Sequence, residues 1–188
     1  MLSEKELVEG CLSQNRAIEK LLYLRYSSKM YALCLRYAKD KEEAKDLLQE
    51  GFIKVFANIN SYSFKGSLEG WIRRVIINIA LNHIKSSKKY KWESIHDRNF
   101  ESNESEENPI FELEEEAFST EELEKALNSL SEVYRVVFNM YCIDEFSHAE
   151  IGKFLSIDEK TSRTRLCRAK AMLKEKLIAI RKSKNTVN

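Results

Sequence analysis

Apolar residues recur at three- and four-residue intervals over most of the first ninety positions, which predicts amphipathic helices. An opening helical pair should break near residues 13–15. One helix follows Asp40, a typical N-cap with Glu43 three residues on, and a long helix follows Ser67. Residues 58–67 form the clearest loop. The predicted inner faces are Ala44, Leu47, Leu48, Phe52, Val55 and Phe56 in the first of these helices, and Leu68, Trp71, Ile72, Val75, Ile76 and Ile79 in the second.

The apolar pattern then stops, and it returns about thirty residues later. The intervening segment is acidic, poor in apolar residues and holds the only proline, which is typical of a flexible linker. We therefore predict an all-α fold in which a helical-bundle domain of residues 1–90 and a domain of residues 119–182 flank a linker of residues 91–118. The second domain is expected to hold four short helices, and Ser119 and Ser131 are expected to cap the first two.

The last two of these helices are predicted to be joined by a tight turn. Ser147 and Glu150 have capping-box spacing and open the first. The second begins at about Asp158, with either Asp158 itself or the pair Ser156 and Glu159 as its cap. Basic residues crowd the second helix, as in a helix-turn-helix whose second helix reads DNA. An exposed basic helix packed on a core is the alternative.

The net charge of +1 conceals a segregation of charge along the chain. Residues 1–90 carry 16 Lys and Arg against 10 Asp and Glu, residues 91–130 carry 3 against 13, and residues 131–188 carry 12 against 7. Two basic units therefore flank an acidic strap. This pattern suits a polyanion that is contacted at two places.

Other features narrow the class of protein. No apolar run approaches the length of a membrane span and the N-terminus lacks the pattern of a signal peptide, so we expect a cytoplasmic protein with no membrane insertion. The four cysteines and three histidines are scattered without ligand spacing. We therefore predict no metal site, no cofactor and no catalytic residue.

Three stretches, in one order along the chain, resemble bacterial sigma-70-type factors. EEAKDLLQEGFIKVF (residues 42–56) is similar to their core-binding helix, GWIRRVIINIALNHIKSSKK (residues 70–89) to their promoter −10 helix, and residues 130–177 to their −35-reading domain. The short two-domain organisation is similar to the extracytoplasmic-function (ECF) subgroup. The resemblance implies a non-enzymatic sigma factor that binds core RNA polymerase and promoter DNA and assists promoter opening. An anti-sigma factor is a further expected partner.

The sequence departs from the family pattern at several positions. Lys160 and Ser162 stand where the family usually has glycine and a β-branched residue, and Ser156 occupies a turn position often held by glycine. Asn78 matches the family's Arg-Asn pair, but Ile77 replaces its arginine. The fold should survive these changes, whereas base preference need not follow the family average.

One predicted surface is a helix face opposite the buried stripe. Residues 46, 49, 50 and 53 share this face by their spacing. The resemblance implies that it docks on the clamp helices of the polymerase large subunit, where carboxylates would pair with basic groups. A merely solvated face is the alternative. The predicted polymerase-binding residues are Asp46, Leu47, Gln49, Glu50 and Ile53.

A second predicted surface captures the −10 element. Aromatic rings in the loop, which are expected to be free of core packing, would hold unstacked bases, while basic and amide side chains contact phosphates and base edges. Trp71 is expected to be core. In the alternative, the loop rings cover a small satellite core. The predicted −10 residues are Tyr62, Phe64, Lys65, Arg73, Arg74, Asn78, Asn82 and Lys85.

The third predicted surface is the arginine-rich helix. Ser162 and Arg165, with Arg163 as a third candidate, are predicted to meet base edges in the −35 element. Thr164, Arg168 and Lys170 are expected to contact phosphate, whereas Leu166, Ala169 and Leu173 should face the core. The predicted −35 residues are Lys160, Thr161, Ser162, Arg163, Thr164, Arg165, Arg168 and Lys170.

Two other functions compete with a sigma factor. A helix-turn-helix regulator could bind duplex DNA alone, but it needs neither the acidic helix face nor the aromatic loop. A nucleic-acid-modifying enzyme would need a metal cluster or a phosphate-cradling loop, and neither pattern is found. The linker is either a solvated tether or, as the resemblance implies, a nucleic-acid mimic in the polymerase channel.

Overall fold

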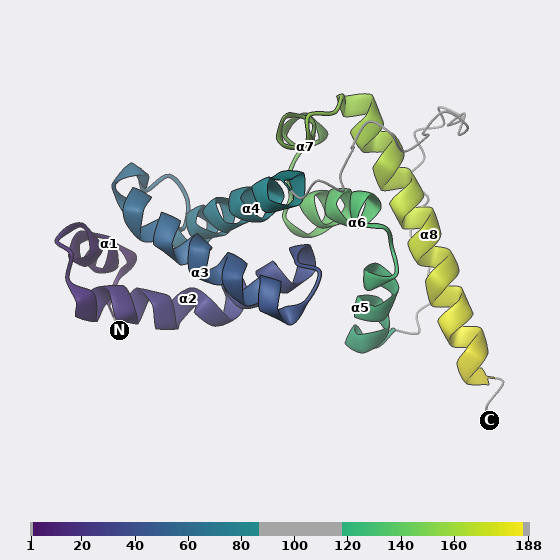
Figure 1. Ribbon diagram of the computed structural model, residues 1–188, viewed down its shortest axis with the longest axis horizontal. Coiled ribbons are helices and arrows are strands. Elements are labelled where there is room, and N and C mark those ends of the chain that lie inside the picture. The colour runs from purple at the N-terminus through teal and green to yellow at the C-terminus, as the bar shows by residue number, and fades with distance from the viewer. Residues whose placement is uncertain (1, 87–117, 186–188) are drawn as a thin grey trace. The chain divides into compact units, whose positions relative to one another are not determined.

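The structure is a computed structural model that describes residues 2–86 and 118–185 (Figure 1). The chain divides into two compact units, residues 1–90 and residues 91–188. Every regular element within the described residues is a helix, and the predicted all-α class with two helical domains is confirmed. The predicted linker, apart from Phe118, lies outside the described residues.

The N-terminal unit is a bundle whose helices follow one another closely in sequence. In this unit α2, α3 and α4 pack on one another, and α1 lies against α2 and the 3₁₀ turn η1 (Figure 1). The predicted break between the first two helices and the predicted start of α4 are confirmed. The elements are α1 (Glu4–Leu12), α2 (Arg16–Tyr37), α3 (Lys41–Asn58), η1 (Ile59–Ser61) and α4 (Leu68–Ser86).

Local signals start α3, and close packing positions it against α4. The Asp40 side chain accepts the Glu43 N–H at 2.8 Å, as the capping pattern predicts. The predicted stripe of α3 is buried or half-buried. Gly51 is also buried, and a Cβ atom there would lie 2.7 Å from Cγ1 of Ile76 on α4. The missing side chain therefore allows the two backbones to approach.

The C-terminal unit is organised around one long helix. Helices α5, α6 and α7 each pack on α8 (Figure 1), and Ala126, Leu173 and Leu177 form a buried cluster where α5 meets α8. The prediction of four short helices is wrong for α8, which runs for 27 residues because neither proline nor glycine interrupts it. The elements are α5 (Thr120–Asn128), α6 (Glu132–Phe138), the π-helix η3 (Asn139–Ile143), α7 (His148–Leu155) and α8 (Glu159–Asn185).

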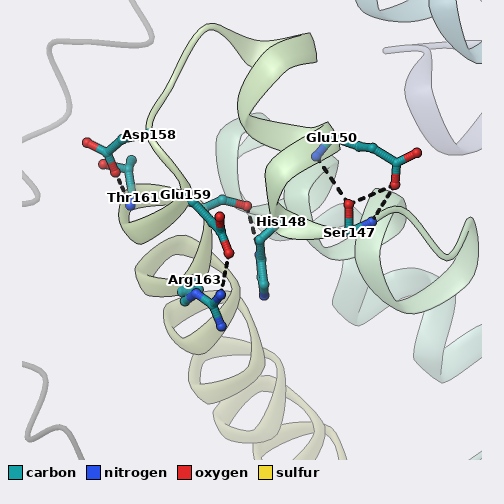
Figure 2. Close-up of polar contacts among 8 residues, drawn as sticks. Ser147, His148, Glu150, Asp158, Glu159, Thr161 and Arg163 are labelled. Atoms are coloured by element: carbon teal, nitrogen blue, oxygen red, sulfur yellow. Dashed lines mark hydrogen bonds and ion pairs between the residues drawn. The ribbon is translucent and has the colours of Figure 1, made fainter.

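Side-chain caps set the starts of α7 and α8. Ser147 and Glu150 form the predicted capping box, and the Asp158 carboxylate accepts the Thr161 N–H (Figure 2). Of the two caps considered for α8, Asp158 is confirmed and the Ser156–Glu159 pair is wrong. Ser156 instead ends α7 in the left-handed conformation at φ 57°.

The two helices before this motif begin at serines as predicted. Ser119 and Glu122 form the predicted capping box at the start of α5. Ser131 occupies the N-cap position of α6, but its side chain makes no capping hydrogen bond. The position predicted for Ser131 is therefore correct, whereas its side-chain role is not.

Candidate nucleic-acid and polymerase interface

The outer face of α3 combines charge with an exposed apolar side chain. Asp46, Gln49 and Glu50 are exposed, and Ile53 keeps 60% of its surface exposed. Single exposed apolar side chains are common on protein surfaces, and what distinguishes Ile53 is that carboxylates share its helix face. Leu47 does not belong to the face. It is 2% exposed and packs in the bundle core, so its assignment to a polymerase-binding surface is wrong.

The two aromatic rings in the loop of residues 62–67 differ in burial. Tyr62 is 6% exposed, its hydroxyl donates to the Gly66 carbonyl at 2.8 Å, and its ring centroid lies 5.7 Å from that of Trp71. The expectation that Tyr62 is free of core packing is therefore wrong, and the satellite-core alternative describes it. Trp71 is half-buried rather than fully core. Phe64 remains 53% exposed, and Lys65 is exposed beside it.

A row of polar side chains follows along α4. Arg74, Asn78 and Asn82 are all exposed, and their four-residue spacing aligns them on one helix face. Lys85 continues this row as a fourth exposed residue. Arg73 departs from it: it is half-buried and lines a hollow of about 470 Å³ together with residues of both charge signs.

The first turns of α8 correct two predictions. Ser162 is 0% exposed and Arg165 is 2% exposed, so neither side chain is presented to a DNA groove in this structure. The reason is that α8 packs on α6 and α7 along one stripe, and both residues lie on it. The burial of Ser162 could have been predicted from the sequence. The predicted apolar stripe of Leu166, Ala169 and Leu173 reaches Ser162 when it is extended backward by one turn.

The other polar residues of this helix remain accessible. Lys160 and Arg163 are exposed, and Arg163 forms an ion pair with Glu159 one turn earlier (Figure 2). Arg168 is half-buried, with its Nη1 atom 3.5 Å from the Tyr134 hydroxyl. Half-buried side chains next to these complete the basic surface; they are Thr161, Thr164 and Lys170.

His148 is the residue that sequence reasoning missed. Its Nδ1 atom lies 2.9 Å from Oγ of Ser162, and its ring stacks on Tyr141 with centroids 4.4 Å apart. Burial, and then the nearby Arg163 guanidinium, lowers the pKa of His148 from 6.5, so the ring is neutral near pH 7. The burial of His148 could have been predicted from its spacing. It precedes the buried Ile151 by three residues and therefore lies on the same side of the helix. The hydroxyl group of Ser162 makes a contact that an aliphatic side chain at position 162 could not make.

No metal centre was found in the described parts of the chain, where no group of three His, Cys, Asp or Glu is placed to hold an ion. Burial raises the pKa of the Cys11 thiol to about 11 and that of Cys34 to about 12, so both stay protonated. Among the helices of residues 2–86 and 118–185, none is long and apolar enough to cross a membrane.

Comparison with known families accounts for both units. Residues 22–90 match the Sigma-70 region 2 model, and residues 120–173 match the Sigma-70 region 4 model. The chain belongs to the sigma-70 family. Within that family it is an ECF RNA polymerase sigma factor, as the following relatives indicate.

ECF RNA polymerase sigma factor SigW of Bacillus subtilis (strain 168) is 29% identical over 158 residues, covering 81% of this chain and 84% of SigW. The ECF RNA polymerase sigma-E factor of Escherichia coli (strain K12) is 27% identical over 186 residues, covering 94% and 95%. A solved structure of the sigma factor RpoE in complex with the anti-sigma factor NepR from Bartonella quintana has a TM-score of 0.53 at 22% identity, covering 84% of this chain and 95% of RpoE.

Proposed function

We propose that three surfaces carry the sigma-factor function of this chain. Core RNA polymerase binds the exposed face of α3, where Asp46, Gln49 and Glu50 surround Ile53. The carboxylates pair with basic groups and set the register of docking, while Ile53 supplies apolar contact. The proposed domains are residues 1–90 and 119–182, with residues 91–118 as the linker.

The −10 element binds the N-terminal domain as partly melted DNA. Phe64 offers an exposed ring on which an unstacked base can lie, and such stacking is worth about 1–3 kcal/mol per base. The aligned amides of Asn78 and Asn82 can donate to and accept from base edges. Lys65, Arg74 and other basic side chains of this surface neutralise phosphates, and Tyr62 supports the loop instead of meeting a base.

The −35 element binds as duplex DNA at the start of α8. Lys160, Arg163 and Thr164 are the side chains that reach base edges, and Arg168 and Lys170 contact phosphate. Because a tether joins the two DNA-binding domains, each raises the effective concentration of the other at a promoter. The spacing of the two elements should therefore affect transcription.

The protein acts without enzyme activity of its own, in the cytoplasm, and under control of an anti-sigma factor. The solved complex of the sigma factor RpoE with the anti-sigma factor NepR supports the last point. The partner of this chain would cover the α3 face or the α4 row, because either contact blocks assembly on polymerase or on DNA.

One observation carries this proposal over a stand-alone regulator: an exposed ring, Phe64, stands in the loop before α4, and that helix bears a row of exposed polar residues. Duplex binding alone needs neither feature. Run-off transcription tests it. Core RNA polymerase with this protein should initiate at a defined set of genomic sites that core alone ignores. If the protein binds a duplex operator tightly by itself and never joins core polymerase, the proposal fails.

A further inference from the structure

The Glu4 carboxylate of α1 lies against the first turn of α4, 64 residues further along the chain. Its Oε2 atom accepts the N–H of Leu68 at 3.1 Å and lies 3.5 Å from the Tyr62 hydroxyl oxygen. The first N–H groups of a helix lack intrahelical acceptors, and a carboxylate is favoured there by the helix dipole. Ser67 accepts the N–H of Gly70 at 3.1 Å. The start of α4 is thus capped both by its own loop and by a distant helix.

The loop that ends at this cap holds a strained residue. Phe64 has φ 58°, a left-handed conformation that costs a bulky residue energy and persists only where the surroundings enforce it. Its ring centroid lies 4.8 Å from that of Tyr62, whose hydroxyl in turn bonds Gly66 across the loop. The Glu4 carboxylate touches both ends of this arrangement, at Tyr62 and at Leu68.

Helix α1 is itself held in place. Arg25 on α2 donates to the Leu2 carbonyl at 2.9 Å, and Ser3 and Glu6 form a capping box at the helix start. Glu4 is half-buried between these anchors and the loop. This helix precedes residues 22–90, the part of the chain that matches the region 2 model.

We infer that Glu4 is a positioning residue for −10 capture, which acts through Tyr62 and Leu68 to hold Phe64 where a melted base can stack on it. The inference rests on the proposed −10 interface. It adds to that interface a segment outside the matched region. Glu4 does not touch DNA; it lowers the freedom of the loop, so that less ordering is needed when the base binds.

The test uses the full chain assembled on saturating core RNA polymerase. The affinity of this assembly is measured for a fork-junction DNA that carries the −10 element found by run-off mapping. The affinity of the chain for core polymerase is measured separately. Glu4→Ala should weaken fork binding about tenfold, the equivalent of one charge-assisted hydrogen bond, and leave core affinity within about twofold. Glu4→Gln keeps an acceptor oxygen and should therefore keep most of the wild-type affinity for the fork DNA. Glu9→Ala, an exposed change on the same helix, is the matched control and should have no effect.

Phe64→Ala separates the outcomes. If Phe64→Ala leaves fork binding unchanged, the proposed −10 interface is wrong. If Phe64→Ala weakens binding but Glu4→Ala does not, only the role of Glu4 is overturned. A positioning role further requires that Glu4→Ala add less than about twofold in the Phe64→Ala background, because the loop ring through which it acts is already gone. Full additivity, or an equal loss of core affinity, would make Glu4 merely structural.

Discussion

The Nδ1 atom of His148 lies 2.9 Å from Oγ of Ser162, and this contact joins the first turn of α7 to the first turn of α8. Both side chains are buried, at 9% and 0% exposure. A polar contact in such a place is directional, so it helps to fix the angle at which α8 leaves α7. Because α8 carries the exposed basic side chains, the pair orients the proposed DNA-reading surface.

His148→Phe and Ser162→Ala should each destabilise the C-terminal unit by about 1–2 kcal/mol, because each leaves one buried polar group without its partner. The double variant should recover most of this loss. Hydrogen exchange of the α7 and α8 amides in the full chain measures the opening free energy locally. Additive losses in the double variant would show that the two side chains do not act as a pair.

Stability of the same unit should fall in mild acid. The pKa of His148 is lowered in the folded protein, so the unfolded chain binds more protons below pH 6.5. The stabilisation is complete above that pH and is lost as the pH falls through the folded pKa. Protonation of His148 would also place a positive charge near the cations Arg163 and Lys170, which repel it. Between pH 7 and pH 5 the wild type should lose opening free energy relative to His148→Phe/Ser162→Ala; parallel pH profiles would contradict this.

Two arginines of α8 should behave differently. Arg165→Ala removes a buried side chain and should cost at least about 2 kcal/mol of stability in the C-terminal unit. Arg163→Ala changes an exposed side chain and should alter stability by no more than about 0.5 kcal/mol. Arg163→Ala should instead weaken binding to the preferred −35 duplex more than to a scrambled one, measured by holoenzyme titration. An equal loss on both duplexes would make Arg163 a phosphate contact.

Asp46→Arg should weaken binding to core RNA polymerase at least about tenfold, because it places a cation where a carboxylate is proposed to meet basic groups. Its folding, followed by far-ultraviolet circular dichroism, should be unchanged, since Asp46 is exposed. Glu9→Arg makes the same change of charge on α1 and is the control. Equal recovery of both variants with core polymerase in a pull-down would remove α3 from the interface.

Ser156→Gly should stabilise the C-terminal unit by about 0.5–1 kcal/mol, because Ser156 ends α7 at φ 57°, where a side chain is disfavoured. Ser129→Gly is the matched control: Ser129 ends α5 at φ −80°, so glycine brings no relief there and should destabilise. Amide exchange in α7 and in α5 reports the two sites separately. A loss of stability at both sites would mean that the left-handed turn is not strained.

Much of the fold could be predicted because its signals are local. Asp40, Ser119 and Ser147 each cap the helix that the sequence predicts, since an N-cap depends only on residues two or three positions away. The apolar stripe of α3 could likewise be predicted from its spacing alone. The full length of α8 escaped prediction, because its later turns pack on α5, and the sequence does not show that these two helices lie together.

The candidate surfaces could be predicted only in part. Ile53 and Arg74 are exposed, as the sequence predicts. Leu47, Tyr62 and Arg165 are buried, which removes them from the surfaces predicted for them. Residue type misled for Tyr62 and Arg165, because a loop tyrosine is often partly exposed and a helical arginine usually is, and only their neighbours in space bury them. Leu47 is different, because its spacing alone places it on the predicted inner face of its helix.

The sequence by itself determined the order of the helices, most of their caps, the separation of two basic units and the family. Only the tertiary structure decided which side of each helix is open, that His148 meets Ser162, and that Glu4 caps α4 across 64 residues. The physical reason is range. Capping and periodicity act within one or two turns of a helix, whereas burial and cross-helix hydrogen bonds depend on which elements pack together.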